Sequence, residues 1–411
     1  MHMIKKTIVL TVLLFCVQIF SQTNTSNLKV FLDCRSCDNT YIKQNLNNVE
    51  FVRDQNFADV HLFFATQRNA NRGRLYDVEF IGKNAFSEMN DKISFSTNTN
   101  MTDDDVRNLI LKQLKLGLVR YWMKKGPVDN ITVKIDTQPI ETNEEEEDPW
   151  NYWVFRLGAN GFLNGQEASK FSNYRFNVSA RRVTDKNKFN VNLSFSENKS
   201  TFNFDGEDII AINNSKSLRV TDVISITDHW SVGAFARVGS STFSNRDFFW
   251  NFKPAIEYNF FKYEESAKKQ LTISYRVGIV NNKYIERTVF GEVKEQLWEH
   301  NFSLGGRINQ KWGNLFAQAE FDQFLNDTTL NSLEFSLGAS IRVFRGFSFN
   351  IDGNYEITRN QINLPAGDVS LEELLLQQQQ LQSGYNYFVS VGFSYSFGSI
   401  YNSIVNPRFN F

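Results

Sequence analysis

Proline, histidine and net charge are all low in this chain of 411 residues, which has 6 prolines, 4 histidines and a formal net charge of −1. The near-neutral balance argues against a nucleic-acid-binding protein. Scarce proline and 15% aromatic residues, mostly phenylalanine, argue against a disordered chain. Beyond the N-terminal segment the histidines are His61, His229 and His300. No nucleophile–base pattern surrounds them, so the sequence predicts no enzyme, no metal site and no cofactor.

Long hydrophobic runs are also missing. After the N-terminus no stretch approaches the roughly 20 apolar residues of a membrane-spanning helix, so a membrane role must come from strands. The shorter run Thr7–Phe20 follows two lysines and precedes the small Ser21. This order predicts a secretory signal peptide over residues 1–21. A lipoprotein acylated at Cys16 is the alternative.

Two cysteines, Cys34 and Cys37, remain once the signal peptide is removed. Cysteines in an oxidising compartment usually pair, and this spacing permits a tight bridge. The sequence therefore predicts a Cys34–Cys37 disulfide that acts as a structural staple. A redox-active dithiol is the alternative, and zinc bound with His61 would lack a fourth ligand.

Residues 22–136 mix strand and helix patterns and predict a small α+β periplasmic domain. The predicted elements are strands at Leu28–Leu32, Val49–Arg53, Ala58–Thr66, Arg74–Ile81 and Ile93–Ser96, with a short helix at Asp38–Leu46. A longer helix follows Thr102, which can cap it, and three aspartates place negative charge in its first turn. Gly126 and Pro127 end this helix.

An acidic run, Glu144–Asp148, follows this domain. Like charges repel and keep a segment extended, so residues 137–149 are predicted to form a solvated linker. Calcium binding is the alternative, but no ligand spacing supports it.

Residues 150–411 alternate between apolar and polar side chains with a period of two. In Phe347–Thr358 the odd positions are mostly apolar and every even position is polar, and Tyr385–Phe397 repeats the alternation. Such alternation indicates strands with one apolar and one polar face. The predicted strands are 151–162, 171–183, 186–198, 215–227, 229–241, 247–261, 269–281, 296–310, 313–324, 331–344, 346–359 and 384–397.

About twelve strands of this length predict a transmembrane antiparallel β-barrel. An even strand count puts both ends of the barrel on the periplasmic side, together with the α+β domain. Long outer loops are expected at 163–170, 199–214, 282–295 and 360–383. A soluble β-sandwich is the alternative, but it seldom needs such long aromatic strands behind a signal peptide.

Two resemblances concern the first half of the chain. Ala58–Leu62, Leu75–Phe80 and the helix start at Asp103 resemble the amino-terminal domain of TolB and related periplasmic partner-binding domains. Phe31–Asp38 followed by Phe51–Asp54 resembles a segment that precedes the barrel in uncharacterised outer-membrane proteins of Bacteroidota. The first resemblance implies a fold, and the second implies a location.

The end of the last predicted strand resembles the assembly signal of outer-membrane barrels, in which a polar residue, a glycine and two aromatic residues stand at fixed spacing. Its members here are Ser390, Gly392, Tyr395 and Phe397. The tail from Gly398 to Phe411 departs from that pattern, because it separates the last strand from the end of the chain.

Charged residues at the inward positions of the predicted barrel divide by sign. The predicted lumen charges are Arg156, Arg175, Arg181, Arg219, Arg237, Arg276 and Arg307 on the earlier strands, and Glu320, Asp322, Glu334, Arg342, Asp352 and Glu356 on the later ones. The positive residues would form one wall of the lumen and the negative residues the facing wall. These walls would either orient solutes in an open channel or pair with each other and fill a narrow barrel. The small strand count favours filling.

Together these features predict a non-enzymatic integral outer-membrane protein of a Gram-negative bacterium. Its barrel would contact outer-membrane lipid and anchor a domain that docks periplasmic or outer-membrane proteins. The alternative is a porin-like channel for small polar solutes, with the periplasmic domain as a gate or spacer.

Overall fold

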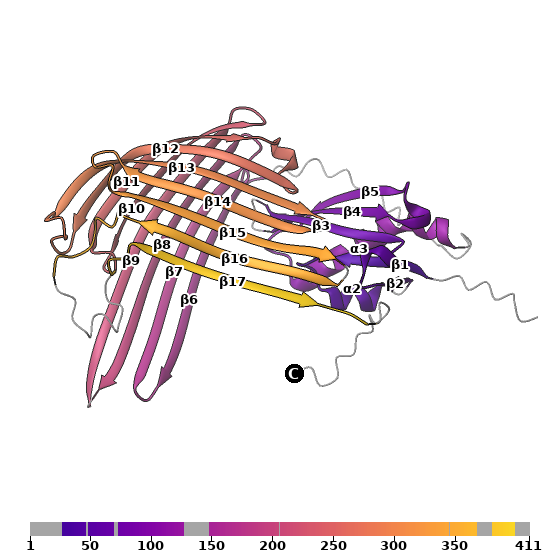
Figure 1. Cartoon of the computed structure of the whole chain (residues 1–411), viewed down its shortest axis with the longest axis horizontal. Coiled ribbons are helices and arrows are strands. Elements are labelled where there is room, and N and C mark those ends of the chain that lie inside the picture. Colours follow the sequence, from indigo (N-terminus) through magenta and orange to yellow (C-terminus); the bar gives the residue numbers. More distant parts are fainter. Residues whose placement is uncertain are drawn as a thin grey trace, which may run out of the picture.

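The structure is a computed structural model that describes residues 27–46, 48–69, 73–126, 148–204, 206–344, 346–367 and 380–398. The predicted signal peptide and all but the last two residues of the predicted linker lie outside the described residues. The described chain forms a small α+β unit and a 12-stranded antiparallel sheet (Figure 1). No helix in these ranges is both long enough and apolar enough to cross a membrane.

The α+β unit contains a five-stranded sheet in the order β2-β1-β3-β4-β5. Its elements are β1 (Leu28–Asp33), α2 (Asn39–Asn45), β2 (Val49–Phe51), η2 (Gln55–Phe57), β3 (Val60–Arg68), β4 (Arg74–Gly82), η3 (Asn84–Phe86), β5 (Asn90–Ser96) and α3 (Asp103–Lys125). β1 pairs in parallel with β2 and β3, and the other pairs are antiparallel. Thr102 caps α3 as predicted and forms a capping box with Asp105. Every predicted element of this domain is present, with ends that differ by a few residues.

The core of this unit lies between α3 and one face of the sheet. The helix contributes Ile110, Leu114 and Leu118, each exposed by no more than 1%. α3 approaches the sheet most closely at Gly117, where an added Cβ would lie 2.1 Å from Cζ of the fully buried Phe80. The glycine therefore sets the distance between helix and sheet.

The opposite face of the same sheet is buried as well. His61, Phe63 and Ala65 of β3 and Ile81 of β4 point away from α3 and are 0–9% exposed. Successive strand residues point to opposite faces, so a strand that is buried without a break needs cover on both sides. The second cover is one end of the 12-stranded sheet.

The second sheet confirms the predicted twelve strands, which follow one another in chain order. They are β6 (Trp153–Gln166), β7 (Ser169–Val183), β8 (Asn187–Phe204), β9 (Glu207–Ser225), β10 (Trp230–Ser241), β11 (Arg246–Asn259), β12 (Lys269–Tyr284), β13 (Lys294–Gln310), β14 (Gly313–Phe324), β15 (Asn331–Phe344), β16 (Phe347–Thr358) and β17 (Tyr385–Tyr395). A 3-10 turn, η5 (Tyr263–Glu265), joins β11 to β12.

Two of the predicted long loops are wrong. Residues 163–170 and 199–214 belong almost entirely to the hairpins β6–β7 and β8–β9, whose strands continue to the turns. Polar residues of 199–201 still pair across the β8–β9 hairpin, with Thr201 opposite Ile210 and Lys199 opposite Ile212, so the strands continue where the composition resembles a loop. The loops between β12 and β13 and between β16 and β17 are long, as predicted.

The sheet has two edges, β6 and β17. Within the described ranges these strands do not pair with each other, and every residue of β17 is exposed. Figure 1 shows a curved sheet with the α+β unit at one end of β14 to β17. The 12-stranded antiparallel sheet is thus established, and its closure into a ring stays a prediction.

Candidate functional site

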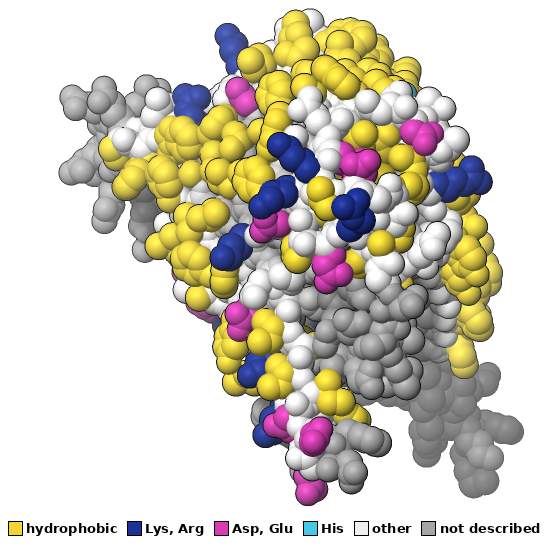
Figure 2. Space-filling model, turned by 90° about the vertical axis from the view of Figure 1, so that its left-hand side faces the viewer, with side chains coloured by type: hydrophobic (Ala, Val, Ile, Leu, Met, Phe, Trp, Pro, Cys, Tyr) yellow, Lys and Arg dark blue, Asp and Glu magenta, His cyan; other side chains and the backbone are white. Residues whose placement is uncertain are grey.

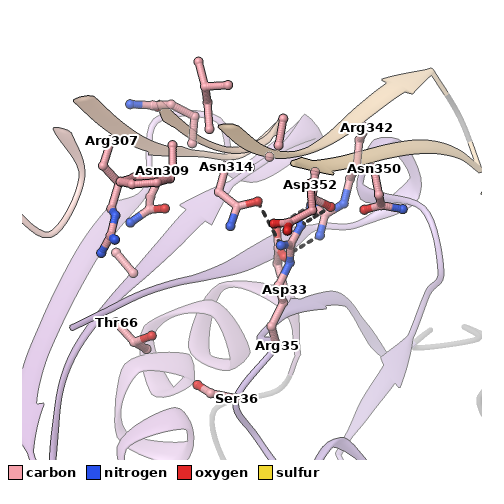
Figure 3. A pocket seen from close by; sticks show the side chains of 18 of the residues that line it. Asp33, Arg35, Ser36, Thr66, Arg307, Asn309, Asn314, Arg342, Asn350 and Asp352 are labelled. Atoms are coloured by element: carbon pink, nitrogen blue, oxygen red, sulfur yellow. Dashed lines mark hydrogen bonds and ion pairs between the residues drawn. The ribbon is translucent and has the colours of Figure 1, made fainter. Parts of the chain in front are cut away.

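The two halves of the chain meet at the rim of the 12-stranded sheet, defined here as the ends of β11–β17 and their turns nearest the α+β unit. Asp33, the last residue of β1, faces Arg342 near the end of β15 (Figure 3). Nη1 and Nη2 of Arg342 donate to Oδ2 and Oδ1 of Asp33, each at 2.5 Å. This bidentate geometry is the strongest form of an arginine–carboxylate contact. Asp33 is 8% exposed, so the pair is largely withdrawn from water.

His61 supports Asp33 from the neighbouring strand β3. Its Nε2 lies 3.1 Å from Oδ2 of Asp33, and its fully buried ring packs edge-on against Phe31 and Phe63. Burial lowers the pKa of His61, and this outweighs the opposing attraction of Asp33. The neutral imidazole therefore donates its Nε2 proton to Asp33. Its Nδ1 is buried and has no hydrogen-bond partner among the described residues.

The charge on Asp33 is stabilised by these two partners. Burial by itself would raise the pKa of Asp33, but hydrogen bonds from Arg342 and His61 and the charge of Arg342 lower it to about 2. Asp33 is therefore ionised at neutral pH, and the contact with Arg342 is an ion pair.

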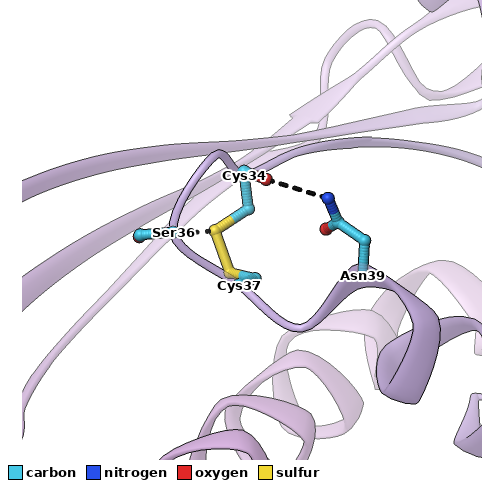
Figure 4. The surroundings of a disulfide bond; sticks show 4 residues. All are labelled: Cys34, Ser36, Cys37 and Asn39. Carbon is cyan, nitrogen blue, oxygen red and sulfur yellow. Dashed lines mark hydrogen bonds between the residues drawn. A yellow bond between two sulfur atoms is a disulfide. The ribbon is translucent and has the colours of Figure 1, made fainter. Parts of the chain in front are cut away.

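The predicted disulfide between Cys34 and Cys37 is present, directly after Asp33 (Figure 4). It closes a tight turn, and Nδ2 of Asn39 at the start of α2 donates to the carbonyl of Cys34 at 3.2 Å. The bridge thus fixes the direction in which Arg35 leaves the turn. This arrangement fits the predicted staple, and redox activity stays an untested alternative.

Arg35 is the second residue that reaches the rim. Its Nη1 donates to Oδ1 of Asn314 at 2.9 Å, and its Nη2 donates to Oγ of Ser340 at 2.8 Å. Two further contacts join the same face of the α+β unit to the β11–β12 turn. They are the hydrogen bond from Ser266 to Gln67, at 3.4 Å, and the ion pair between Lys268 and Glu79.

Three of the predicted lumen arginines lie over phenylalanine rings. The guanidinium carbon lies 4.4 Å from the ring centre for Arg276 over Phe235, 5.1 Å for Arg237 over Phe249 and 5.5 Å for Arg307 over Phe316. No ion pair joins a predicted lumen arginine to a predicted lumen carboxylate within the described ranges. The expected mutual pairing is therefore not found among the described residues.

The predicted lumen carboxylates share amide partners instead. Nδ2 of Asn301 donates to Glu320 at 2.7 Å and to Asp322 at 3.0 Å, and Nδ2 of Asn354 donates to Glu334 at 2.5 Å. The remaining predicted lumen residues, which make no ion pair in the described part of the chain, are Arg156, Arg175, Arg181, Arg219, Asp352 and Glu356. Their exposure to an enclosed lumen stays a prediction.

The other singled-out residues have local roles. His229 Nδ1 lies 2.7 Å from the carbonyl of Asn259, and His300 Nε2 lies 3.1 Å from Oε1 of Gln323. Of the predicted assembly signal, Ser390, Gly392 and Tyr395 lie in β17, and Phe397 stacks on Tyr395.

The partner of Arg342 was not predicted from the sequence. Periodicity placed Arg342 on a lumen wall, and no sequence pattern gave Asp33, Arg35 or His61 a part in docking. One signal was present in the sequence, because Val60–Ala65 is apolar on both faces apart from His61. A strand of that kind is normally covered on both sides.

No protein-family model matches this chain, and no curated protein matches it. Solved structures with similarity include the NanC porin, with 12% identity over 59% of this chain and 100% of that chain, at a TM-score of 0.30. The translocator domain of the autotransporter NalP from Neisseria meningitidis shows 14% identity over 60% and 88%, at a TM-score of 0.31. The CymD monoaromatic hydrocarbon channel shows 10% identity over 60% and 80%, at a TM-score of 0.30. These likenesses are too weak to assign a family or an activity.

Proposed function

We propose that this chain is an integral outer-membrane protein whose 12-stranded sheet anchors a periplasmic docking domain. The surface of the sheet supports the first part. Outward apolar residues include Leu193, Phe302, Phe335, Val391 and Phe393, which are 40–76% exposed. Seen from the end opposite the α+β unit, hydrophobic side chains gather mostly around the periphery, and charged ones lie nearer the middle (Figure 2). Lipid contact accounts for so large an apolar surface better than water does.

Aromatic residues near the rim support the proposed orientation. Trp153 stacks on Phe155 with ring centres 5.8 Å apart, and Trp230 lies 4.7 Å from Tyr258. Such rings favour the boundary between hydrocarbon and water. The α+β unit would then lie just outside the membrane on the periplasmic side.

The strand edges also bear on the proposal. A backbone N–H or C=O that faces hydrocarbon without a partner costs several kcal/mol. We therefore propose that β6 and β17 pair in the membrane and close the sheet into a barrel.

The docking role is supported by one observation: the α+β unit is held to the rim by the face opposite α3, and no other described segment covers the helix side. On that side Leu116 and Met123 are 54% and 48% exposed. They are seven residues apart, so they lie on the same face of the helix. An apolar pair on a solvated domain fits a protein partner.

A channel is the second candidate, and described segments lie against both ends of the sheet. The α+β unit lies against the ends of β11–β17, and residues 359–367, between β16 and β17, pack at the other end. Ile362 of that loop is 2% exposed and packs with Val280 and Phe324. Val289 N donates to the carbonyl of Leu364 at 2.8 Å, which ties this loop to the β12–β13 loop.

The docking role can be tested in intact cells by placing a photo-crosslinking amino acid at position 116 of the full chain. We expect one discrete envelope protein to be captured, and we expect Met123→Glu to reduce its capture severalfold by placing a charge on the same helix face. Leu163 on β6 is 70% exposed and provides a matched control position on the sheet for the photo-crosslinking amino acid.

The ion conductance of the purified chain in planar bilayers distinguishes a membrane anchor from a channel. If the sheet is a membrane anchor for a docking domain, we expect no steady ion current. A steady current together with no adduct at position 116 would favour the channel and contradict docking.

A further inference from the structure

A cavity of about 870 Å³ lies beside the Asp33–Arg342 pair, between the α+β unit and the 12-stranded sheet (Figure 3). Its polar wall includes Thr66, Arg307, Asn309, Asn314, Asn350 and Asp352. The volume falls within the usual range of small-molecule sites, about 300 to 1,000 Å³. Because both halves of the chain form the wall, the cavity exists only while the α+β unit is docked.

The charge of the cavity wall is positive on balance. It contains four arginines, Arg35, Arg74, Arg307 and Arg342, and two aspartates, Asp33 and Asp352. Asp33 and Arg342 neutralise each other, and Arg35 donates to neutral groups. Arg74 and Arg307 form no ion pair with any carboxylate in the described part of the chain. An anionic group would therefore be attracted to this cavity.

Arg307 is the best-placed anion receptor in the wall. Its guanidinium lies over the ring of Phe316, 5.5 Å from the ring centre, which restricts its orientation. In Figure 3 its side chain points away from the sheet, toward Thr66 of the α+β unit. A planar guanidinium with no protein carboxylate can bind a ligand carboxylate through two parallel hydrogen bonds.

The rest of the wall suits hydroxyl groups. Nδ2 of Asn309 donates to the carbonyl of Ala267, so its Oδ1 is left as an acceptor. Asn350 and Ser390 add donors and acceptors, and the Asp352 carboxylate accepts hydrogen bonds from hydroxyls. In Figure 3 Asp352 lies on the side of the Arg342 pair, away from Arg307. The cavity thus offers a cationic end and a hydrogen-bonding end.

We propose that this cavity binds a small hydroxylated carboxylic acid of the size of a sugar acid, with the carboxylate on Arg307 and the hydroxyls on the asparagines and Asp352. This site goes beyond the docking role and rests on the junction geometry alone. Ligand binding would favour the docked α+β unit, because the ligand contacts both halves.

Isothermal titration of the full chain in a nonionic detergent tests the site with D-glucuronate and D-glucose, which differ in the carboxylate. We expect glucuronate to bind at least 10-fold more tightly than glucose. Arg307→Gln should weaken glucuronate binding at least 10-fold, and Arg307→Lys should give an intermediate affinity because the charge remains and the fork is lost. Arg175→Gln, on a strand outside the cavity, should stay within twofold of the wild type.

Three results would overturn the proposal: no binding of glucuronate, equal binding of both sugars, or wild-type affinity in Arg307→Gln. Circular dichroism shows whether each variant keeps its sheet. If Arg307→Gln unfolds, Asn350→Ala provides the second test. It should weaken glucuronate binding severalfold and leave the preference over glucose in place, and an unchanged affinity would count against the site.

Discussion

Replacing Arg342 with alanine should release the α+β unit from the rim. The change leaves Asp33 buried without its cation, and breaking a buried ion pair in this way costs about 3 to 5 kcal/mol. Detachment lets Asp33 reach water, so we expect the docked state to be lost. Hydrogen exchange measures this directly. Amides of β3 near Phe63 and Ala65 are paired with β1 and β4 and exchange only when the α+β unit opens. They should exchange roughly 100-fold faster, because loss of the docked contact lowers that opening free energy by about 3 kcal/mol.

Two comparisons make this result specific. Arg156→Ala removes an arginine near the same end of the sheet that makes no ion pair in the described part of the chain, and it should leave β3 protected. Arg342→Lys keeps the positive charge but loses the two parallel hydrogen bonds of the guanidinium, so its effect should be smaller. Unchanged exchange at β3 in Arg342→Ala would show that the pair does not hold the unit in place.

Acidification should destabilise the α+β unit in two stages. The pKa of His61 in the folded state is below 6.5, so the imidazole binds a proton at a higher pH in the unfolded chain than in the folded one. The stability of the folded state therefore falls as the pH drops below about 6.5. The pKa of Asp33 is about 2 in the folded state, compared with an ordinary value of 3.8. Its contribution, roughly 2 kcal/mol, is present above pH 4 and is lost between about pH 4 and pH 2.

Hydrogen exchange gives the opening free energies of β1 and β3 once the intrinsic exchange rate at each pH is taken into account. These free energies should show both stages. His61→Gln keeps a donor for Asp33 but has no charge to gain. This variant should lose the first stage and keep the second. If the wild type is equally stable at pH 7 and pH 3, the buried Asp33–His61–Arg342 arrangement does not describe the folded protein.

The sequence was most informative about regular elements. The period-two alternation identified all twelve strands, because a sheet with one apolar and one polar face imposes that pattern along its length. Thr102 and the aspartates after it identified the start of α3, because helix capping depends on residues that are close together in the sequence. Loop lengths were less predictable. In 163–170 and 199–214 small polar residues extend the strands, and their composition resembles that of a loop.

Contacts between distant segments were not predictable from local patterns. Asp33 and Arg342 are 309 positions apart, and neither stands in a motif that names the other. Periodicity placed Arg342 on the inward face of its strand but gave no information on what approaches the strand end. The disulfide was predictable from the spacing of the two cysteines. Its effect on the direction of Arg35 could be seen only from the path of the chain in the structure.

The most direct test of the account is a cysteine cross-link across the junction in intact cells. Gln67→Cys and Ser266→Cys replace side chains that meet at 3.4 Å, from β3 and from the β11–β12 turn. We expect rapid intramolecular cross-linking of this pair, with the linked peptides identified by mass spectrometry. Gln67→Cys combined with Thr328→Cys, on the turn between β14 and β15 at the other end of the sheet, should stay unlinked. Equal linking of the two pairs, or none in the first, would contradict a periplasmic domain seated on the rim of the sheet.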